Sequence, residues 1–451
     1  MVQDITLWVG ADVHKNTIAI CVLRGDSQVN ETQEFASDSE TVRRVFKKLA
    51  NSGHLRVAYE AGPCGYTLRR QLEAMGISCE VIAPSLIPKK AGDRVKNDRR
   101  DAIKIARMFR AGELTTIRVP TEKEEAARDL LRCREDLMQD LQRERQRLLK
   151  FLLRQGIVWR ETMNWTDKHW KWLRQLRFDD VLSQRGFDEY LALVDTRVGR
   201  LKDLDREIEV LAEKEPWKEQ VDRLKCLRGI RTLTAMIILT EVQDFRRFES
   251  PRQLMNFLGL TPGLHESGSK SHTLAITKTG NEHVRRVLVE AAWQYTRRPQ
   301  WPRALDKRCD GQSPAIKREA KEAQDRLSFR YRHLRDKGKK PTVAVVAVAR
   351  EMLGFIWAIM VKHVNPNERK ASPPRQQALT PGQTKMPPSA RKTRPAPKPV
   401  PIAKETPSPS TPTQRSKGPN RPRPNPSSKP PSASVPSNIE IHCNATLSLR
   451  G

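Results

Sequence analysis

Cysteine is scarce in this chain, and its placement argues against two classes of protein. The seven cysteines among 451 residues are scattered and odd in number, and none forms a CxxC pair. Neither a zinc knuckle nor a disulfide framework is therefore supported. The first residues also lack the uncharged core of a signal peptide, because Asp4 and Asp12 interrupt them. We expect a reduced, cytoplasmic protein.

Long uncharged hydrophobic runs are lacking as well. The most apolar late segment, 343–361, is broken by Arg350 and Glu351. A membrane span needs about 20 consecutive, mostly apolar residues. Pro341, just ahead of the segment, is typical of the first turn of a helix. The segment predicts a core helix, and we expect no membrane partner.

Aromatic residues are missing from the end of the chain. From Pro366 onward there is no Trp, Tyr or Phe, 15 basic residues stand against 3 acidic ones, and 20 of the 31 prolines occur. A segment of this composition cannot bury enough apolar surface to fold. We predict a disordered basic tail over 365–451.

The body that precedes this tail carries +18 of the formal net charge of +30. Lys and Arg gain affinity for nucleic acid by releasing the counterions of its phosphates. An acidic small molecule does not need so much charge. A membrane surface would fit the charge alone, but no amphipathic anchor is evident. DNA or RNA is therefore the expected partner.

Residues 1–120 have the pattern of an α/β domain, in which β-rich runs alternate with amphipathic stretches. Strands are predicted over 5–9, 17–23, 31–36, 54–60 and 78–82. Helices are predicted over 39–51, with Ser39 as the cap, over 66–75 and over about 98–110. Asp12 to Asn16 is typical of a turn.

Residues 121–220 have the pattern of long helices. Thr121 and Glu124 form a capping box, and leucines keep one face apolar between 130 and 152. A second run over 190–211 has heptad-like steps. An antiparallel arm of two helices and a coiled coil between subunits both fit. Between the runs lie four tryptophans, for which packing at the tip of the arm is favoured over base stacking.

Residues 221–364 are predicted to be mainly helical, with a loop over 261–279 that is small, polar and rich in Gly and Ser. Asn281 is predicted to cap a helix that reaches Tyr295. The segment 224–231 resembles half of a helix-hairpin-helix, in which a glycine turn offers backbone N–H groups to a phosphate. A plain packing unit is an equal alternative.

Four carboxylates of the α/β domain predict a metal site. Asp12 follows the first strand and Glu60 ends the strand 54–60. Asp98 and Asp101 are three apart at a helix start, so their side chains lie about 5–6 Å apart on one face. If the strands are neighbours and the helix crosses their ends, the four acids converge and need cations.

The chemistry of such a site follows from its ligands. Hard oxygen ligands select Mg²⁺ or Mn²⁺, and two ions about 3.5–4 Å apart stabilise the attacking and leaving oxygens of phosphodiester cleavage. Each acid taken alone also has an ordinary explanation. Asp98 would cap a helix, Asp101 would pair with Arg94 or Lys104, and Asp12 would hold a turn.

The segment 263–272 contains Ser267 beside a glycine, with Lys270 and His272 nearby. A serine in such a setting is a candidate nucleophile. Taken alone the signal is weak, because Ser/Gly segments are usually plain loops or backbone cradles for phosphate.

These motifs occur in one order that resembles a known family. Asp12-Val13-His14-Lys15, Tyr59-Glu60-Ala61 and the segment 96–102 resemble the N-terminal domain of the DEDD transposases of bacterial insertion sequences, the IS-one-ten family. Piv/MooV-type DNA invertases are relatives of that family. The C-terminal half is similar too, through Leu258-Gly259-Leu260-Thr261-Pro262, Ser267-Gly268 and the segment 277–281. The resemblance covers roughly residues 5–361.

The resemblance implies an architecture and a set of catalytic residues. It implies an α/β RNase H-like (RuvC-like) N-terminal domain over 1–120, a long helical coiled-coil arm over 121–220 and a mainly α C-terminal transposase domain over 221–364, ahead of the disordered basic tail. It further implies that Ser267, brought from another subunit, attacks a DNA phosphate and forms a phosphoserine intermediate. Ser269 and Ser271 stay alternatives. The implied Mg²⁺ ligands, with Mn²⁺ as a substitute, are Asp12, Glu60, Asp98 and Asp101.

The resemblance also implies partners. These are the DNA of the element ends and the target, a structured bridge RNA encoded by the element as guide, and further copies of the chain in a dimer or tetramer. A bacterial, nucleoid-associated protein in the cytoplasm is the corresponding expectation.

Two departures and three alternatives accompany this interpretation. Asn97 stands where Thr often precedes the first Asp, and Arg231 stands where the turn would have a second Gly. The sequence also fits a site-specific DNA invertase of the Piv type and a RuvC-like structure-selective nuclease that uses the acids alone. The third alternative is a nucleic-acid-binding protein with an inactive site.

Overall fold

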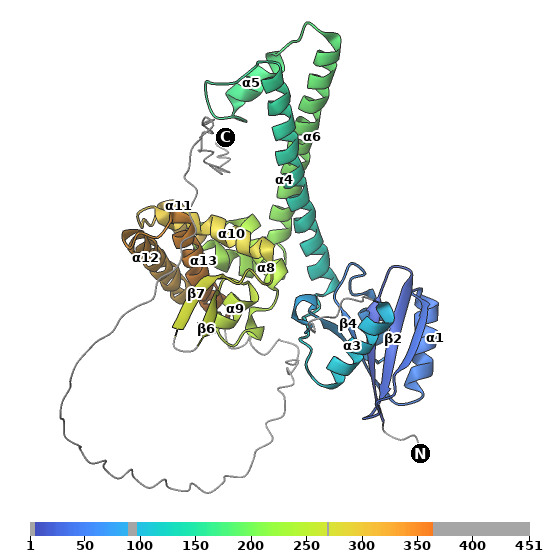
Figure 1. Cartoon of the computed structure of the whole chain (residues 1–451). Coiled ribbons are helices and arrows are strands. Elements are labelled where there is room, and N and C mark those ends of the chain that lie inside the picture. Colours follow the sequence, from blue (N-terminus) through green and yellow to red (C-terminus); the bar gives the residue numbers. More distant parts are fainter. Residues whose placement is uncertain (1–4, 89–96, 268–269, 364–451) are drawn as a thin grey trace, which may run out of the picture. The chain divides into compact units, whose positions relative to one another are not determined.

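The computed structural model describes residues 5–88, 97–267 and 270–363 (Figure 1). Of residues 266–271 only the backbone is described, and only at 266, 267, 270 and 271. The predicted tail, 365–451, lies outside the described residues, as do Arg94 and Ser269. The described part consists of an α/β region followed by helices and a small second sheet.

The α/β region is built on a five-stranded mixed sheet of order β3-β2-β1-β4-β5. Strands β1, β2 and β3 pair antiparallel, whereas β4 and β5 run parallel to β1. The sheet is consistent with the RuvC-like fold that the resemblance implies. Its strands are β1 (Thr6–Val13), β2 (Thr17–Arg24), β3 (Glu31–Ala36), β4 (His54–Glu60) and β5 (Ser78–Ile82).

Helices cover both faces of this sheet. α1 (Ser39–Ala50) and α2 (Thr67–Ala74) pack Phe46 and Leu72 against the strand residues of one face. α3 (Asp98–Arg110) covers the other face, where Ala102 and Ala106 meet β2 and Phe109 meets β4 and β5. Because successive strand side chains point to opposite faces, the near-continuous apolar runs of β1 and β2 are buried on both sides.

Two local predictions for this region are wrong. The cap of α1 is Asp38 and not Ser39, because the Asp38 carboxylate accepts the Thr41 N–H at 2.8 Å. Asp12 does not lie in a turn after the first strand. It lies within β1, where it pairs with Ala19, because the antiparallel pairing continues to Val13.

Two long helices follow, α4 (Glu122–Arg154) and α6 (Val181–Ala212). They pack antiparallel within one chain. Arg134 of α4 pairs with Asp205 of α6, whereas Glu144, which comes later in α4, pairs with Arg197, which comes earlier in α6. The predicted capping box of α4 is confirmed. A coiled coil between subunits stays a prediction.

The tip of this helical pair carries α5 (Asp167–Gln175) and the four tryptophans. Trp159, Trp165 and Trp172 surround the buried ring of His169, at centroid distances of 5.2–5.5 Å. The tryptophans therefore pack against one another and His169, as the sequence favours over base stacking.

The C-terminal described residues form a helical domain around one apolar core. By length and hydropathy alone, the stretch Pro341–Lys362 is sufficient to cross a membrane. Within the fold, however, Val345, Val348 and Met352 are completely buried in the core, so the predicted core helix is present. The helices are α7 (Lys218–Lys225), α8 (Thr232–Val242), α9 (Pro251–Phe257), α10 (Glu282–Ala292), α11 (Arg303–Arg308), α12 (Pro314–Asp336) and α13 (Pro341–Trp357), with short turns of helix at Pro84–Leu86, Phe245–Arg247, Trp293–Thr296 and Ala358–Lys362.

The prediction of a loop over 261–279 is wrong for most of that segment. β6 (Pro262–Ser267) and β7 (Lys270–Ile276) form an antiparallel two-stranded sheet there. The apolar side chains of Leu264 and Leu274 are exposed, so the described side chains do not show the regular buried alternation that signals a strand in sequence. The cap of α10 is Asn281, as predicted.

Candidate active site

The first two predicted acids lie side by side at the carboxyl ends of neighbouring strands. The parallel pairing of β1 with β4 ends at Ala11 and Tyr59. Asp12 and Glu60 are the next residues on the two strands, so their side chains leave the sheet on the same face. Glu60 is exposed and Asp12 is partly buried.

A close helix–strand contact brings the other two acids to this edge. At Gly10 of β1, an added Cβ would lie 2.2 Å from the Ala106 nitrogen and 2.4 Å from the Ala102 oxygen of α3. Only a glycine allows α3 to lie so near the strand. Asn97 caps α3 by accepting the Arg99 N–H. Asp98 is therefore not the cap, and its carboxylate is available for other contacts.

His14 joins two of these acids. Its Nε2 lies 3.4 Å from Asp12 Oδ2 and 3.4 Å from Asp98 Oδ1, and ligand atoms of the three residues all lie within 4.8 Å of one another. The structure thus brings Asp12 and Asp98 together. Asp101 lies near enough to act electrostatically on Asp12. Glu60 is on the same edge but not in the group of three.

His14 is a site residue that the residue-by-residue argument missed. In the sequence it stands out only within the motif Asp12-Val13-His14-Lys15. The available signal was its spacing, because residues two apart at a strand end point to one side. An imidazole between two carboxylates holds both in position, as the outer partners of metal ligands do.

The electrostatics of the cluster favour a bound cation. Burial raises the pKa of the Asp12 carboxyl, and the nearby Asp98 and Asp101 raise it further, whereas His14 acts in the opposite direction. The charged form of Asp12 is thus disfavoured until positive charge arrives. Carboxylate oxygens of this kind fit a hard divalent ion.

The contact at Gly10 leads to a first prediction. Gly10→Ala should lower the free energy of unfolding by about 1–3 kcal/mol, because the new methyl group overpacks the strand–helix contact. It should also weaken Mn²⁺ binding, because α3 must move away from Asp12. Urea unfolding and calorimetry measure the two effects. The matched control is Gly199→Ala in α6, where an added Cβ meets nothing within 4 Å; equal behaviour of the two variants would contradict the role of Gly10.

The predicted nucleophile lies on the β6–β7 hairpin. Ser267 is the last residue of β6 and pairs with Lys270, and Ser271 pairs with Glu266. The side chains of Ser267 and Ser271 and the whole of Ser269 lie outside the described residues. The role of Ser267 and its approach to the acids stay predictions.

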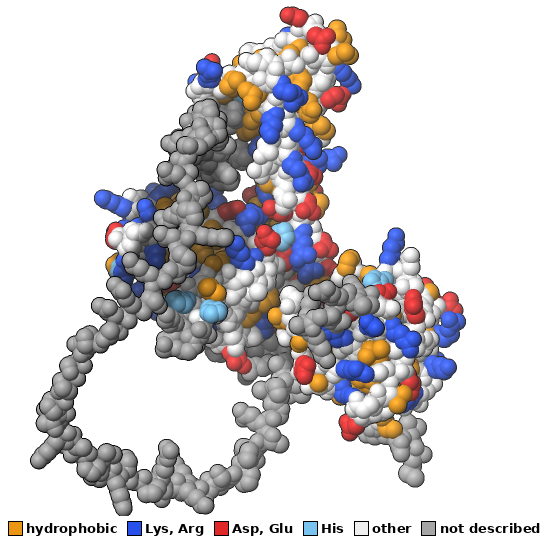
Figure 2. Space-filling model, viewed as in Figure 1, with side chains coloured by type: hydrophobic (Ala, Val, Ile, Leu, Met, Phe, Trp, Pro, Cys, Tyr) orange, Lys and Arg blue, Asp and Glu red, His pale blue; other side chains and the backbone are white. Residues whose placement is uncertain are grey.

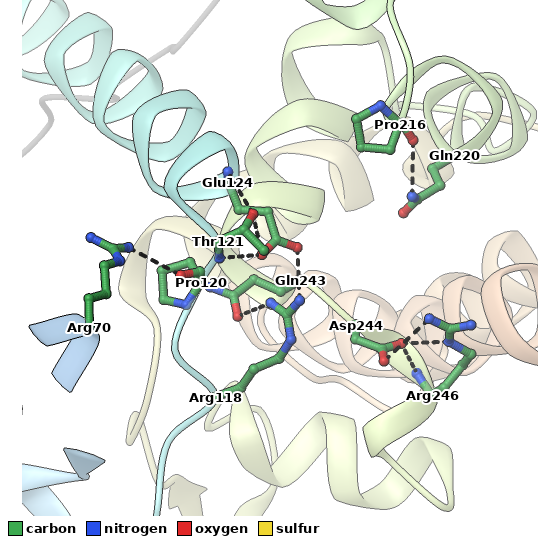
Figure 3. A network of polar contacts seen from close by, with 10 residues as sticks. All are labelled: Arg70, Arg118, Pro120, Thr121, Glu124, Pro216, Gln220, Gln243, Asp244 and Arg246. Carbon is green, nitrogen blue, oxygen red and sulfur yellow. Dashed lines mark hydrogen bonds and ion pairs between the residues drawn. The ribbon is translucent and has the colours of Figure 1, made fainter. Parts of the chain in front are cut away.

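A polar network ties the end of the α/β region to α4 and to the helical domain (Figure 3). Arg118 donates to Gln243 Oε1 at 2.6 Å and to Glu124 Oε1 at 2.9 Å. Arg70 of α2 donates to the Pro120 carbonyl at 3.3 Å. These bonds hold the strand-to-helix connection that leads from the acids into the arm.

A cluster of arginines surrounds the start of α8. Gly229, in the turn before it, has a φ of +87°, and an added Cβ would lie 2.5 Å from the Ala291 oxygen. Burial lowers the pKa of both Arg228 and Arg308, with smaller contributions from like charges. Among the described residues no carboxylate pairs with the members of this cluster, which are Arg228, Arg231, Arg297 and Arg308.

Comparison with known proteins agrees with the fold and the site. A family model for DEDD transposases, described as "Transposase", matches residues 9–156. A second, described as "Transposase IS116/IS110/IS902 family", matches residues 221–307. The first match covers the acid cluster, and the second covers the arginine cluster except Arg308.

Curated relatives extend over most of the chain. It is 41% identical to the putative transposase y4qE of Sinorhizobium fredii, over 78% of this chain and 88% of the relative. It is 37% identical to the transposase for insertion sequence element IS1533 of Leptospira borgpetersenii, over 74% and 98%. A more distant relative, at 25% identity over 65% and 74%, is the transposase for insertion sequence element IS1111A of Coxiella burnetii.

The mixed sheet, its carboxylate edge and these matches define a DEDD-type transposase, an enzyme that cleaves and rejoins DNA. The chain belongs to the IS110/IS116/IS902 family of insertion-sequence transposases. Membership implies DNA binding and the use of a divalent metal, for which Asp12, His14 and Asp98 form a candidate site.

Proposed function

We propose that this transposase cleaves and rejoins the ends of its own insertion sequence with Mg²⁺ and a serine nucleophile. The metal would be held by Asp12, Glu60, Asp98 and Asp101, and Mn²⁺ would substitute for it. The supporting observation is the meeting of Asp12 and Asp98 at His14, on the edge where Glu60 also ends its strand.

Bound metal supplies positive charge that polarises the scissile phosphate and stabilises the transition state. Asp12 and Glu60 would hold the metal from the sheet, and Asp98 and Asp101 would hold it from α3. His14 orients Asp12 and Asp98 through its Nε2. Held in this way, the carboxylates need little rearrangement when DNA arrives.

Ser267 carries the covalent step of the proposal. Its hydroxyl loses a proton and attacks phosphorus, so that a serine O–P bond forms while the bond from phosphorus to the bridging DNA oxygen breaks. The released strand end takes up a proton and becomes a hydroxyl. Attack of another hydroxyl end on the phosphoserine reverses the step, so rejoining needs no high-energy cofactor.

The proposal includes partners besides the DNA. A bridge RNA encoded by the element would guide the choice of target, on the strength of the family resemblance. A dimer or tetramer would bring Ser267 of one subunit to the acids of another. The exposed apolar side chains of Met163, Val181 and Leu182, 67–80% accessible at the tip of the helical pair, fit such an assembly.

DNA backbone contacts are assigned to the basic surface. On the face shown in Figure 2, Lys and Arg side chains lie along the helical pair as well as over the α/β region. The arginine cluster at the start of α8 adds partly desolvated charge that no described carboxylate neutralises. Desolvated guanidinium groups beside a glycine turn are suited to phosphate.

The arginine cluster leads to a second prediction. Arg231→Ala should weaken DNA binding at all sequences alike and reduce the slope of log affinity against log salt by about 1. Fluorescence anisotropy over a salt series measures this slope. Arg43→Ala on α1 removes the same charge from another exposed position and serves as control. An unchanged slope in Arg231→Ala would remove that residue from the DNA-binding surface.

The proposed function is tested by trapping the covalent intermediate. Full-length protein, element-end DNA, candidate flanking RNA and Mg²⁺ should give a protein–DNA adduct that survives denaturant, with the phosphate on one serine peptide. A nuclease that uses the acids alone would give cut DNA without an adduct. An invertase would give the adduct but recombine only inverted sites.

A further inference from the structure

A hollow of about 420 Å³ opens beside the acid cluster, at the carboxyl-end edge of the sheet. Its walls come from the end of β1, the segment after β4 and the first turns of α2. His14 lies in its wall and also contacts Asp12 and Asp98 at 3.4 Å. His14 is thus common to the hollow and the acid cluster, although the apolar lining of the hollow lies on the α1/α2 face of the sheet and Asp12 lies on the α3 face. A nucleotide joined to the proposed phosphate would reach the hollow by crossing the sheet edge at His14.

The lining has an apolar floor and a polar rim. Ile18, Val42 and Leu68 are almost completely buried side chains that form the floor. Thr67 and Lys15 are exposed at the rim. Among the described residues no carboxylate pairs with Lys15, so its ammonium is available to an anionic ligand.

This lining suits a nucleobase better than a polar sugar or a bare phosphate. The faces of a base are apolar and would cover the floor, whereas its edge carries the donors and acceptors that the rim can meet. Gln71 provides the one amide in the wall. Its Nε2 donates to the Ser39 carbonyl and hydroxyl, so its Oε1 is available as an acceptor. A base inside a duplex cannot enter, because its faces are covered by its neighbours.

We propose that the hollow binds the base of the DNA nucleotide next to the scissile phosphate, unstacked from the helix, and that Lys15 contacts the adjoining phosphate. This rests on the proposed metal-dependent cleavage at Asp12. Unstacking costs a few kcal/mol, and it would anchor the strand so that only one phosphate meets the metal ligands. The hollow would therefore help to select the cleavage position.

The test uses 2-aminopurine, whose fluorescence rises when it leaves the base stack. It is placed in turn at each position flanking the cleaved phosphate, and full-length protein is added with Ca²⁺ in place of Mg²⁺ to retain binding without cleavage. Fluorescence should rise at one flanking position. Apart from His14, no aromatic ring of the described residues lines the hollow, so the signal is not quenched there.

Thr67→Met should remove this rise, because a longer side chain fills the hollow from the exposed first turn of α2. Mg²⁺-dependent cleavage should fall by at least about tenfold, as expected for a pocket of the wrong size. Mn²⁺ affinity and the melting temperature should be unchanged, since Thr67 contacts none of the acids. Ala74→Met, at an exposed position of the same helix, should behave like the wild type.

The outcomes separate this inference from the function on which it rests. No rise at any flanking position in bound DNA, or an equal rise in Thr67→Met, overturns the base-binding hollow. A rise only when 2-aminopurine is placed in the RNA overturns the assignment to DNA. A DNA signal that Thr67→Met removes, without any Mg²⁺-dependent cleavage by the wild type, supports the hollow and refutes the proposed chemistry.

Discussion

Asp12→Asn should abolish metal-dependent DNA cleavage, with a fall of at least about 10³-fold. Charge stabilisation by bound metal contributes several kcal/mol to such reactions, and each 1.36 kcal/mol corresponds to tenfold in rate. Asp12 is the acid at the centre of the cluster, in contact with His14 and acted on by Asp98 and Asp101. Its replacement removes a ligand from the position that the other residues share.

A gel assay on supercoiled element DNA, with Mg²⁺ and with Mn²⁺, measures the loss. We expect no loss of folding, because burial raises the pKa of Asp12 and the charges of Asp98 and Asp101 act in the same direction, against the opposing effect of His14. A neutral Asn relieves this repulsion, and the metal-free variant should melt no lower than the wild type at pH 7. The control is Asp26→Asn in an exposed turn, which should cleave normally. Metal-dependent cleavage retained by Asp12→Asn would exclude the residue from the site.

Ser267→Ala should eliminate the covalent protein–DNA adduct completely. The proposed intermediate is an ester of that hydroxyl, and an alanine has no oxygen with which to form it. Metal affinity should be unchanged, because the four acids are intact. Denaturing gels of labelled DNA, followed by mass spectrometry of the modified peptide, measure the result.

The neighbouring serines provide the matched comparison. Ser269→Ala and Ser271→Ala make the same chemical change within the same hairpin region, and both should retain the adduct. If one of these variants lost the adduct while Ser267→Ala kept it, the nucleophile would be that other serine and not Ser267. Cleavage without any adduct in the wild type would favour a hydrolytic nuclease.

Much of the α/β region was predictable because its signals are local. The strands over 54–60 and 78–82 were predicted with the bounds that the structure shows, since each is a short apolar run ended by turn residues. The helix that carries Asp98 and Asp101 was predicted over about 98–110, which the structure confirms. The order of motifs along the chain was sufficient to indicate the family.

Other features depend on which segments meet. In the hairpin over 262–276, apolar side chains such as Leu264 and Leu274 are exposed, so the pattern of a buried strand face did not mark it in the sequence. The cap is Asp38 rather than Ser39 because of where the backbone of α1 begins. Both neighbouring residues have polar side chains that can cap a helix, so the sequence does not decide between them. That no carboxylate of the described residues pairs with the arginine cluster depends on contacts in space and cannot be predicted from local sequence.

The sequence by itself determined the kinds of residue at the site and their order, because carboxylates at strand ends and an Asp pair one helical turn apart are properties of local segments. Only the tertiary structure decided how they meet. Strand register sets Asp12 beside Glu60, the absence of a side chain at Gly10 lets α3 approach β1, and together these place His14 between Asp12 and Asp98. The contacts of Gly10 with α3 and of His14 with Asp98 join residues more than 80 positions apart, and no local periodicity encodes a distance of that kind.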